Sequence, residues 1–151
     1  MNKSFLLTKE GVAELEKELA GLIAERKPVA DAIKTAREFG DLAENAEYQS
    51  ARQEQEKLEA RISEIEHILL NVEIIGKPKN GNKVQVGSMV TLKNGATKKF
   101  QVVGTVEADP LNGKISDESP IGMALLGKKL GDKVEIVTPA ETATYKIAQI
   151  A

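Results

Sequence analysis

Four acidic side chains stand close together in residues 38–47, which read EFGDLAENAE. Asp41 and Glu44 have the spacing of a helix capping box, with Asp41 as the N-cap and Glu44 at the third helical position. Both acids would also be favoured by the positive end of a helix that begins there. As a functional signal this spacing is weak, and taken alone it predicts a helix cap.

The same two carboxylates have the chemistry of metal ligands. Mg²⁺ takes oxygen ligands in octahedral geometry and keeps several waters, so Asp41 and Glu44 cannot hold it by themselves. They could complete a site whose other ligands belong to a partner protein. Phosphodiester hydrolysis commonly uses two metal ions about 4 Å apart. A protein that supplies ligands for the second ion would strengthen a weak nuclease activity of its partner.

Two patterned runs flank the acidic segment and predict long helices. Apolar or small residues recur at steps of three and four from 12 to 36, with Arg26 as the interruption, and again from 48 to 72. This spacing is typical of a coiled coil. Thr8 provides an N-cap for the first helix and Gly40 a stop for it. Because few residues separate the runs, we expect an antiparallel hairpin with the acids at its tip. Such hairpins also serve as spacers or dimerisation arms.

Charge and composition change near residue 76. Residues 1–75 hold 10 Lys or Arg and 16 Asp or Glu, a net charge of −6, whereas residues 76–151 hold 11 and 7, a net charge of +4. We therefore expect a hairpin domain at 1–75, a linker at 76–82 and a second domain at 83–151. The positive charge of the second domain is too small to argue for nucleic-acid binding.

The second domain is predicted to be a small α+β unit. Its β-rich ranges are 83–92, 98–106, 132–138 and 142–150, and Asn94-Gly95 is a strong hairpin signal. Ser119-Pro120 starts a short helix and Gly127 ends it. The fold class expected for the chain is α+β: an antiparallel coiled-coil hairpin followed by a twisted antiparallel sheet with one short helix.

Composition limits the remaining possibilities. The chain has no Cys, so disulfides and thiolate metal sites are not available to it. It shows neither a signal peptide nor about 20 consecutive apolar residues, and we expect a cytoplasmic protein. Its one histidine, His67, lies outside the apolar seam of the second helix, where we expect it to be exposed and without a partner, a poor candidate for a metal ligand.

The tip residues resemble a known family. Arg37-Glu38, Gly40-Asp41-Leu42, Glu44-Asn45-Ala46-Glu47-Tyr48 and Ala51-Arg52 are similar to the tip motif of the Gre transcript-cleavage factors. The similarity extends over the whole chain, including hairpin length and the Lys-Pro pair at 27–28, and it is closer to the GreA branch than to the GreB branch. This resemblance implies an FKBP-like fold for the second domain.

The resemblance also implies a function. A Gre factor binds bacterial RNA polymerase, inserts its coiled coil into the secondary channel and stimulates cleavage of backtracked RNA, without being an enzyme itself. Asp41 and Glu44 would help to hold the second Mg²⁺ and its water, jointly with the polymerase active site. Arg37 and Arg52 would contact the RNA 3′ end, and Glu118, Ser119 and Pro120 would dock on the channel rim. A likeness to this family further implies association with DNA, and the hairpin makes a monomer the default.

Other interpretations of these residues stay open. Arg37 and Arg52 could instead form salt bridges with Glu38, Glu44 or Glu47, and Ser119-Pro120 could be only a helix cap. Phe39 and Tyr48 are expected to pack the end of the hairpin. For the whole chain the alternatives are an inhibitory Gre relative that blocks the channel, or a structural coiled-coil adaptor unrelated to polymerase. A free-standing metal hydrolase is the weakest alternative, since the tip offers no further ligands.

Overall fold

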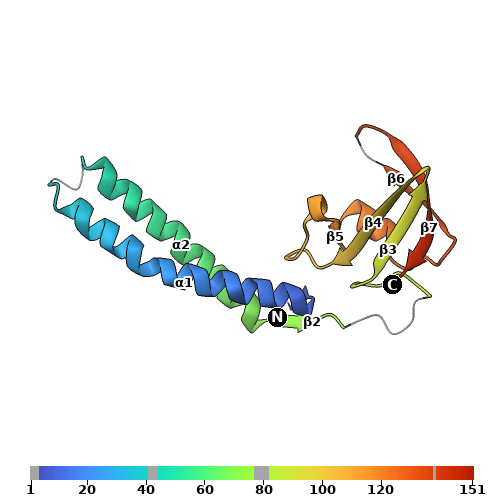
Figure 1. Ribbon diagram of the computed structural model, residues 1–151, viewed down its shortest axis with the longest axis horizontal. Helices are drawn as coiled ribbons and strands as arrows, with labels where there is room; N and C mark the ends of the chain where they lie inside the picture. The colour runs from blue at the N-terminus through green and yellow to red at the C-terminus, as the bar shows by residue number, and fades with distance from the viewer. Residues whose placement is uncertain (1–3, 41–43, 77–81, 138) are drawn as a thin grey trace. The chain divides into compact units, whose positions relative to one another are not determined.

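The computed structural model describes residues 4–40, 44–76, 82–137 and 139–151 (Figure 1). These residues form two compact units, of which Val12–Asn71 is one and the other described residues are the second. Most of the expected linker, 77–81, lies outside the described residues, so the predicted domain boundaries stay predictions. Within the described ranges, no helix is both long and apolar enough to cross a lipid bilayer.

The helical hairpin is confirmed. Helices α1 (Lys9–Arg37) and α2 (Ala46–Leu70) lie side by side and antiparallel (Figure 1). Thr8 caps α1, because its Oγ1 accepts a hydrogen bond from Gly11 N at 3.1 Å. Gly40 follows the end of α1 with φ of +113°, a conformation that glycine adopts without strain. The buried seam contains Val29, Ile33, Ala51, Leu58 and Ile62, with Leu19, Leu22 and Tyr48 packed against it.

Two ion pairs fix the register between the helices. Arg26, which interrupts the apolar pattern of α1, donates through Nε and Nη2 to the two carboxylate oxygens of Glu59 at 2.9 and 3.0 Å. Arg61 of α2 donates in the same forked manner to Glu18 at 2.8 and 3.0 Å. The hydrogen bond from Arg61 lowers the pKa of the Glu18 carboxyl below its usual range. Forked Arg–carboxylate pairs constrain geometry more than single contacts do.

The second unit is built on a five-stranded sheet with the order β5-β4-β3-β7-β6. Its strands are β3 (Met89–Asn94), β4 (Ala96–Val103), β5 (Lys114–Ser116), β6 (Lys133–Val137) and β7 (Thr142–Ile150). The predicted hairpin turn is confirmed, with Gly95 at φ of +70°. The sheet is mixed rather than wholly antiparallel, because β5 pairs with β4 in parallel.

One predicted strand begins too early. The range 83–92 was expected to be extended throughout, but β3 starts at Met89. A turn precedes it, in which Ser88 N donates to Gln85 O at 3.0 Å and Gln85 N donates to Ser88 Oγ at 2.9 Å. Gly87 adopts φ of +98° in this turn. The apolar Val84 that suggested a strand is instead buried from a loop.

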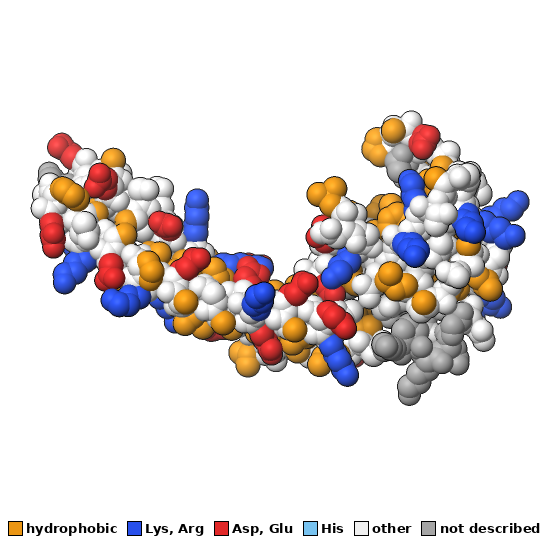
Figure 2. All heavy atoms as spheres, viewed as in Figure 1, with side chains coloured by type: hydrophobic (Ala, Val, Ile, Leu, Met, Phe, Trp, Pro, Cys, Tyr) orange, Lys and Arg blue, Asp and Glu red, His pale blue; other side chains and the backbone are white. Residues whose placement is uncertain are grey.

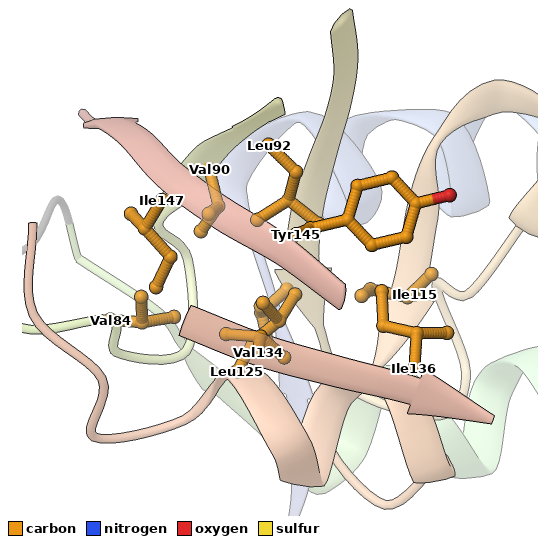
Figure 3. Close-up of a cluster of buried hydrophobic side chains, with 10 residues drawn as sticks. Val84, Val90, Leu92, Ile115, Leu125, Val134, Ile136, Tyr145 and Ile147 are labelled. Carbon is orange, nitrogen blue, oxygen red and sulfur yellow. The ribbon is translucent and has the colours of Figure 1, made fainter. Parts of the chain in front are cut away.

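A single apolar core lies on one face of this sheet (Figure 3). The short helix α3 (Pro120–Leu125) is confirmed, with Ser119 as its N-cap, and it contributes the fully buried Leu125. Side chains alternate between the two faces of a strand. The core residues on the inner face are Val90, Leu92, Val102, Ile115, Val134, Ile136, Tyr145 and Ile147.

A second, two-stranded sheet was not predicted. Strands β1 (Phe5–Leu7) and β2 (Val72–Ile74) pair in parallel. Residues next to β1 contact the segment after β4: Thr8 donates to Glu107 from its backbone N at 2.8 Å and from Oγ1 at 2.6 Å. Only 4% of the Glu107 side chain is exposed. Gly11 leaves room for this carboxylate, since a Cβ there would lie 2.5 Å from Glu107 Oε1.

Candidate functional site at the hairpin tip

The N-cap of α2 is Asn45, and the predicted capping box is wrong. Helix α2 begins at Ala46, and Asn45 Oδ1 accepts a hydrogen bond from Tyr48 N at 3.1 Å. Glu44 therefore precedes the cap instead of occupying the third helical position. The predicted cap, Asp41, lies outside the described residues. Asn is a preferred N-cap residue, so Asn45 was a visible candidate in the sequence. Asp41 was a competing candidate, because Glu44 follows it at the spacing of a capping box.

Asn45 also joins the two helices. Its Nδ2 donates to the backbone oxygen of Ala36 at 2.7 Å. Ala36 lies in the last turn of α1, and its backbone oxygen also accepts a hydrogen bond from Phe39 N at 3.1 Å. One side chain thus accepts from an amide in the first turn of α2 and donates a second hydrogen bond to a carbonyl at the end of α1. Neither bond requires a charge, so the acids of the tip are not needed for this closure.

The Glu44 carboxylate is left available by this arrangement. Glu44 is exposed and lies in a turn, directly before the cap. With Phe39, Asn45, Ala46 and Glu47 it lines a shallow depression at the tip. Glu47 is exposed in the first turn of α2, where an acid interacts favourably with the helix dipole. Glu44 is thus a tip carboxylate without a capping role.

Among the described residues, the two tip arginines contact side chains of α2. The Arg37 guanidinium carbon lies 5.9 Å from the centre of the Tyr48 ring, within the range of a cation–π contact. Arg52 Nη1 donates to Gln55 Oε1 at 3.3 Å. In the part of the chain that the structure describes, no ion pair joins either arginine to a glutamate of the tip, so the alternative interpretation as salt bridges is not supported there. Contact of these arginines with RNA stays a prediction.

The aromatic residues of the tip divide into two kinds. Tyr48 is half-buried and packs against the seam of the hairpin, as expected. Phe39 was also expected to pack, but its exposed fraction is 69%. The expectation failed because α1 ends at Arg37, so Phe39 falls beyond the helical face that carries the seam.

The described residues do not form a complete metal site. Within residues 4–40, 44–76, 82–137 and 139–151, no three His, Cys, Asp or Glu side chains gather as they do around a metal ion. Glu44 has suitable oxygen chemistry for Mg²⁺, but it would need ligands from elsewhere. His67 is exposed as predicted, yet it has a partner: Asn71 Nδ2 lies 3.4 Å from its Nδ1 and donates to its backbone oxygen at 2.8 Å.

The predicted docking residues 118–120 surround the start of α3. Ser119 Oγ accepts a hydrogen bond from Gly122 N at 3.0 Å and donates to Ser116 O at 2.6 Å. Pro120 occupies the first turn of the helix. Glu118 is exposed, and its Oε2 accepts a weak bond from Thr105 Oγ1 at 3.3 Å. Ser119 and Pro120 thus have a structural role at the start of α3, and Glu118 provides an exposed negative charge beside them.

Comparison with known proteins places the chain in a family. Residues 5–74 match the family described as transcription elongation factor, N-terminal, and residues 78–151 match transcription elongation factor GreA/GreB, C-terminal. The transcription elongation factor GreA of Clostridioides difficile is 45% identical over 154 residues, which cover 99% of this chain and 97% of that protein. The GreA of Lactococcus lactis subsp. cremoris is 44% identical over 155 residues, 99% of each chain.

Among solved structures, the transcription factor Gfh1 is 31% identical, with 99% of each chain covered and a TM-score of 0.49. The two family matches together take in most of the sequence, and the relatives align from end to end. The chain belongs to the GreA/GreB family of transcription elongation factors.

Proposed function

We propose that this elongation factor binds bacterial RNA polymerase, passes its hairpin into the secondary channel and stimulates the polymerase's own cleavage of backtracked RNA. The observation that carries the proposal is the exposed Glu44 carboxylate, which stands at the tip of a two-helix hairpin and is not used by the helix cap. Two packed helices, with axes about 8–10 Å apart, are narrow enough to enter a channel that excludes a globular domain.

Glu44, together with Asp41, would supply carboxylate oxygens to a Mg²⁺ ion held mainly by the polymerase. An ion bound there would supply an activated water molecule, while the other ion of a two-metal site would stabilise the leaving oxygen of the phosphodiester. The role of this chain is to bring negative oxygen ligands to a site that it does not contain. Among the described residues, Glu44 belongs to no group of three potential metal ligands, and the cap of α2 does not use its carboxylate, which supports this role.

Other surfaces would hold the complex together. Arg37 and Arg52 lie on either side of the tip turn and would contact phosphates of the extruded RNA, which is a contact without base specificity. At the other unit, Glu118 would contact the channel rim, while Ser119 and Pro120 hold the start of α3 that presents it. Glu118 is therefore the member of the docking segment whose charge can be removed without loss of the helix cap.

The test is RNA cleavage by a backtracked elongation complex with Glu44→Gln. Removing a metal-site partner costs about 10–100-fold in activity, so we expect cleavage stimulation to fall at least tenfold. Glu47→Gln is the matched control, because it removes the same charge from an exposed glutamate three residues away. Helix content measured by circular dichroism should be unchanged in both variants, since Asn45 makes the cap.

Four results would contradict parts of the proposal. Equal cleavage with wild type and Glu44→Gln would exclude Glu44 as a ligand. An equal loss in Glu44→Gln and Glu47→Gln would indicate a general charge effect. If the wild-type protein slows nucleotide addition and leaves cleavage unchanged, the chain is a channel-blocking relative, and if it does not bind polymerase at all, the adaptor interpretation holds.

A further inference from the structure

The outer face of the five-stranded sheet, opposite the apolar core, carries a row of lysines. Lys93 of β3 pairs directly with Lys146 of β7, and Lys146 pairs directly with Lys133 of β6. All three side chains are exposed. Their strand neighbours, such as Leu92 and Ile147, are buried in the core, which places the three lysines on the opposite face. Neighbouring strands lie about 4.8 Å apart, so this lysine row spans roughly 10 Å.

Hydrogen-bond donors surround the lysine row. Thr97 of β4 pairs with Lys93, which extends the row by one strand, and Lys99 of β4 pairs with Thr91 beside it. Thr91 pairs in turn with Gln149 of β7. The sequences of β3, β4, β6 and β7 contain one acid, Glu135, which pairs with Thr144. This face therefore presents mainly positive charges and polar donors.

The row is electrostatically unfavourable by itself. Like charges directly opposite each other on paired strands destabilise a sheet. In the part of the chain that the structure describes, the ion pairs leave Lys93, Lys133 and Lys146 without an acidic partner. Figure 2 shows lysine side chains gathered over this unit, which contains no arginine, with few acids among them. A bound polyanion would remove the repulsion and gain favourable contacts with all three lysines.

We propose that the lysine row binds the phosphate backbone of a nucleic acid. A nucleic acid offers charges at short, regular intervals, about one per 3.4 Å along each strand of a duplex. Lysines act as flexible point charges on phosphates, and Thr and Gln side chains also contact phosphate oxygens. An acidic protein surface is the less suitable partner, because protein interfaces are depleted in Lys and anchored by aromatic residues, which the lysine row lacks.

The binding is sequence-independent and weak. The lysine row makes no contact that could distinguish bases, and residues 1–75 of the same chain carry a net charge of −6, which repels phosphates. We expect a dissociation constant near 10⁻⁴ M at physiological salt, at the weak end of the range of roughly 10⁻⁴–10⁻⁶ M for non-specific binding. Such a surface acts where another contact has already brought nucleic acid close to it.

The experiment measures fluorescence anisotropy of a short labelled duplex DNA, and of a single-stranded RNA of matching sequence, across a series of salt concentrations. It compares the full-length protein with the triple variant Lys93→Gln, Lys133→Gln and Lys146→Gln. Each lost phosphate contact lowers the slope of log K against log salt by about 0.9 for duplex DNA and about 0.7 for a single strand. We expect a loss of roughly 2 to 3 in slope, and the affinities of the wild-type protein for the two probes distinguish the two sources of phosphate.

A matched control and a rescue sharpen the result. Lys83, Lys128 and Lys129 are exposed in the same unit but lie outside the five strands, so changing all three to Gln removes the same charge elsewhere. This control should keep the wild-type slope, and replacing the lysine row by Arg should retain binding. The triple Gln variant of the lysine row should have a melting temperature no lower than that of the wild type, because it removes the repulsion between like charges.

The proposal is overturned if both Gln triples lose the same slope, if neither does, or if the wild-type protein binds neither nucleic acid at low salt. It is also overturned if poly-glutamate displaces the DNA as efficiently as unlabelled duplex at equal charge, because the row would then suit acidic proteins. None of these measurements involves polymerase, so their outcome is independent of the cleavage function.

Discussion

The dual bonding of Asn45 predicts how firmly the tip of the hairpin is closed. Replacing an Asn cap by Ala costs about 1 kcal/mol, and losing a hydrogen bond to a partly buried carbonyl costs about 1 kcal/mol more. Asn45→Ala removes both the bond from Tyr48 N at 3.1 Å and the bond to Ala36 O at 2.7 Å. We therefore expect the free energy of opening at the tip to fall by about 2 kcal/mol.

Asn45→Asp separates the two contributions. Asp caps a helix as well as Asn does, so the bond from Tyr48 N is kept, but its carboxylate cannot donate to Ala36 O. The expected cost is about 1 kcal/mol, which is half that of the Ala variant. Because α1 and α2 are joined by Asn45 only near the tip, the loss should be local and should leave the Arg61–Glu18 end of the hairpin unchanged.

Amide hydrogen exchange of Gln49, whose N donates to the backbone oxygen of Asn45 at 3.0 Å, measures this opening directly. A loss of 2 kcal/mol corresponds to a fall in protection of roughly 30-fold, and 1 kcal/mol to roughly fivefold. The amide of Ile65, far along α2 and fully buried, is the internal reference and should keep its wild-type rate. If Asn45→Asp exchanges like the wild type, the bond to Ala36 contributes nothing to closure. If the Asp and Ala variants are equal, the cap contributes nothing.

Two further predictions concern the contact between Thr8 and Glu107 and the ion pair between Arg61 and Glu18. Glu107→Ala should lower the free energy of unfolding of its unit by about 2–3 kcal/mol in urea, because Thr8 N loses a buried charged acceptor, whereas Glu107→Gln keeps an acceptor and should cost less. The lowered pKa of Glu18 means that its pair with Arg61 stabilises the hairpin above pH 4.5, the ordinary value, and that this contribution is lost as pH falls through the lowered pKa. Both side chains are about 40% exposed, 38% for Arg61 and 41% for Glu18, so the effect should stay below about 1 kcal/mol. The melting temperatures of the wild type and of Glu18→Gln, measured from pH 3 to 7, should become equal toward pH 3. A difference that stays constant across this range would contradict a stabilising ion pair between Glu18 and Arg61.

Long-range periodicity made the hairpin predictable. Its seam is repeated over many turns, so an interruption such as Arg26 did not obscure the pattern, and the partner of Arg26 became visible only when α2 lay beside α1. The sheet was predictable at Asn94-Gly95 because that turn has a local signature. In contrast, β1 and β5 have three residues each, too few for an alternating pattern to be recognised.

The tip shows why local signals leave a site underdetermined. Asp41 with Glu44 and Asn45 with its following turn are both acceptable helix starts within five residues. The choice between them depends on the bond from Asn45 to Ala36, which exists only after the two helices have met. The exposure of Phe39 has the same origin, since it depends on where α1 stops. The residue types at the tip were therefore readable from sequence, but their division between structure and chemistry was not.

The parallel pairing of β1 with β2 has a consequence for the order of folding. Leu7 pairs with Ile74, so this contact closes a loop that contains the whole hairpin. Contacts between distant residues form slowly when the intervening chain is unstructured, because closing the loop costs entropy that grows with its length. A hairpin that has already formed brings the two ends of that loop together in advance. The pairing of β1 with β2 and the Thr8–Glu107 contact should therefore form after the two helices of the hairpin have folded.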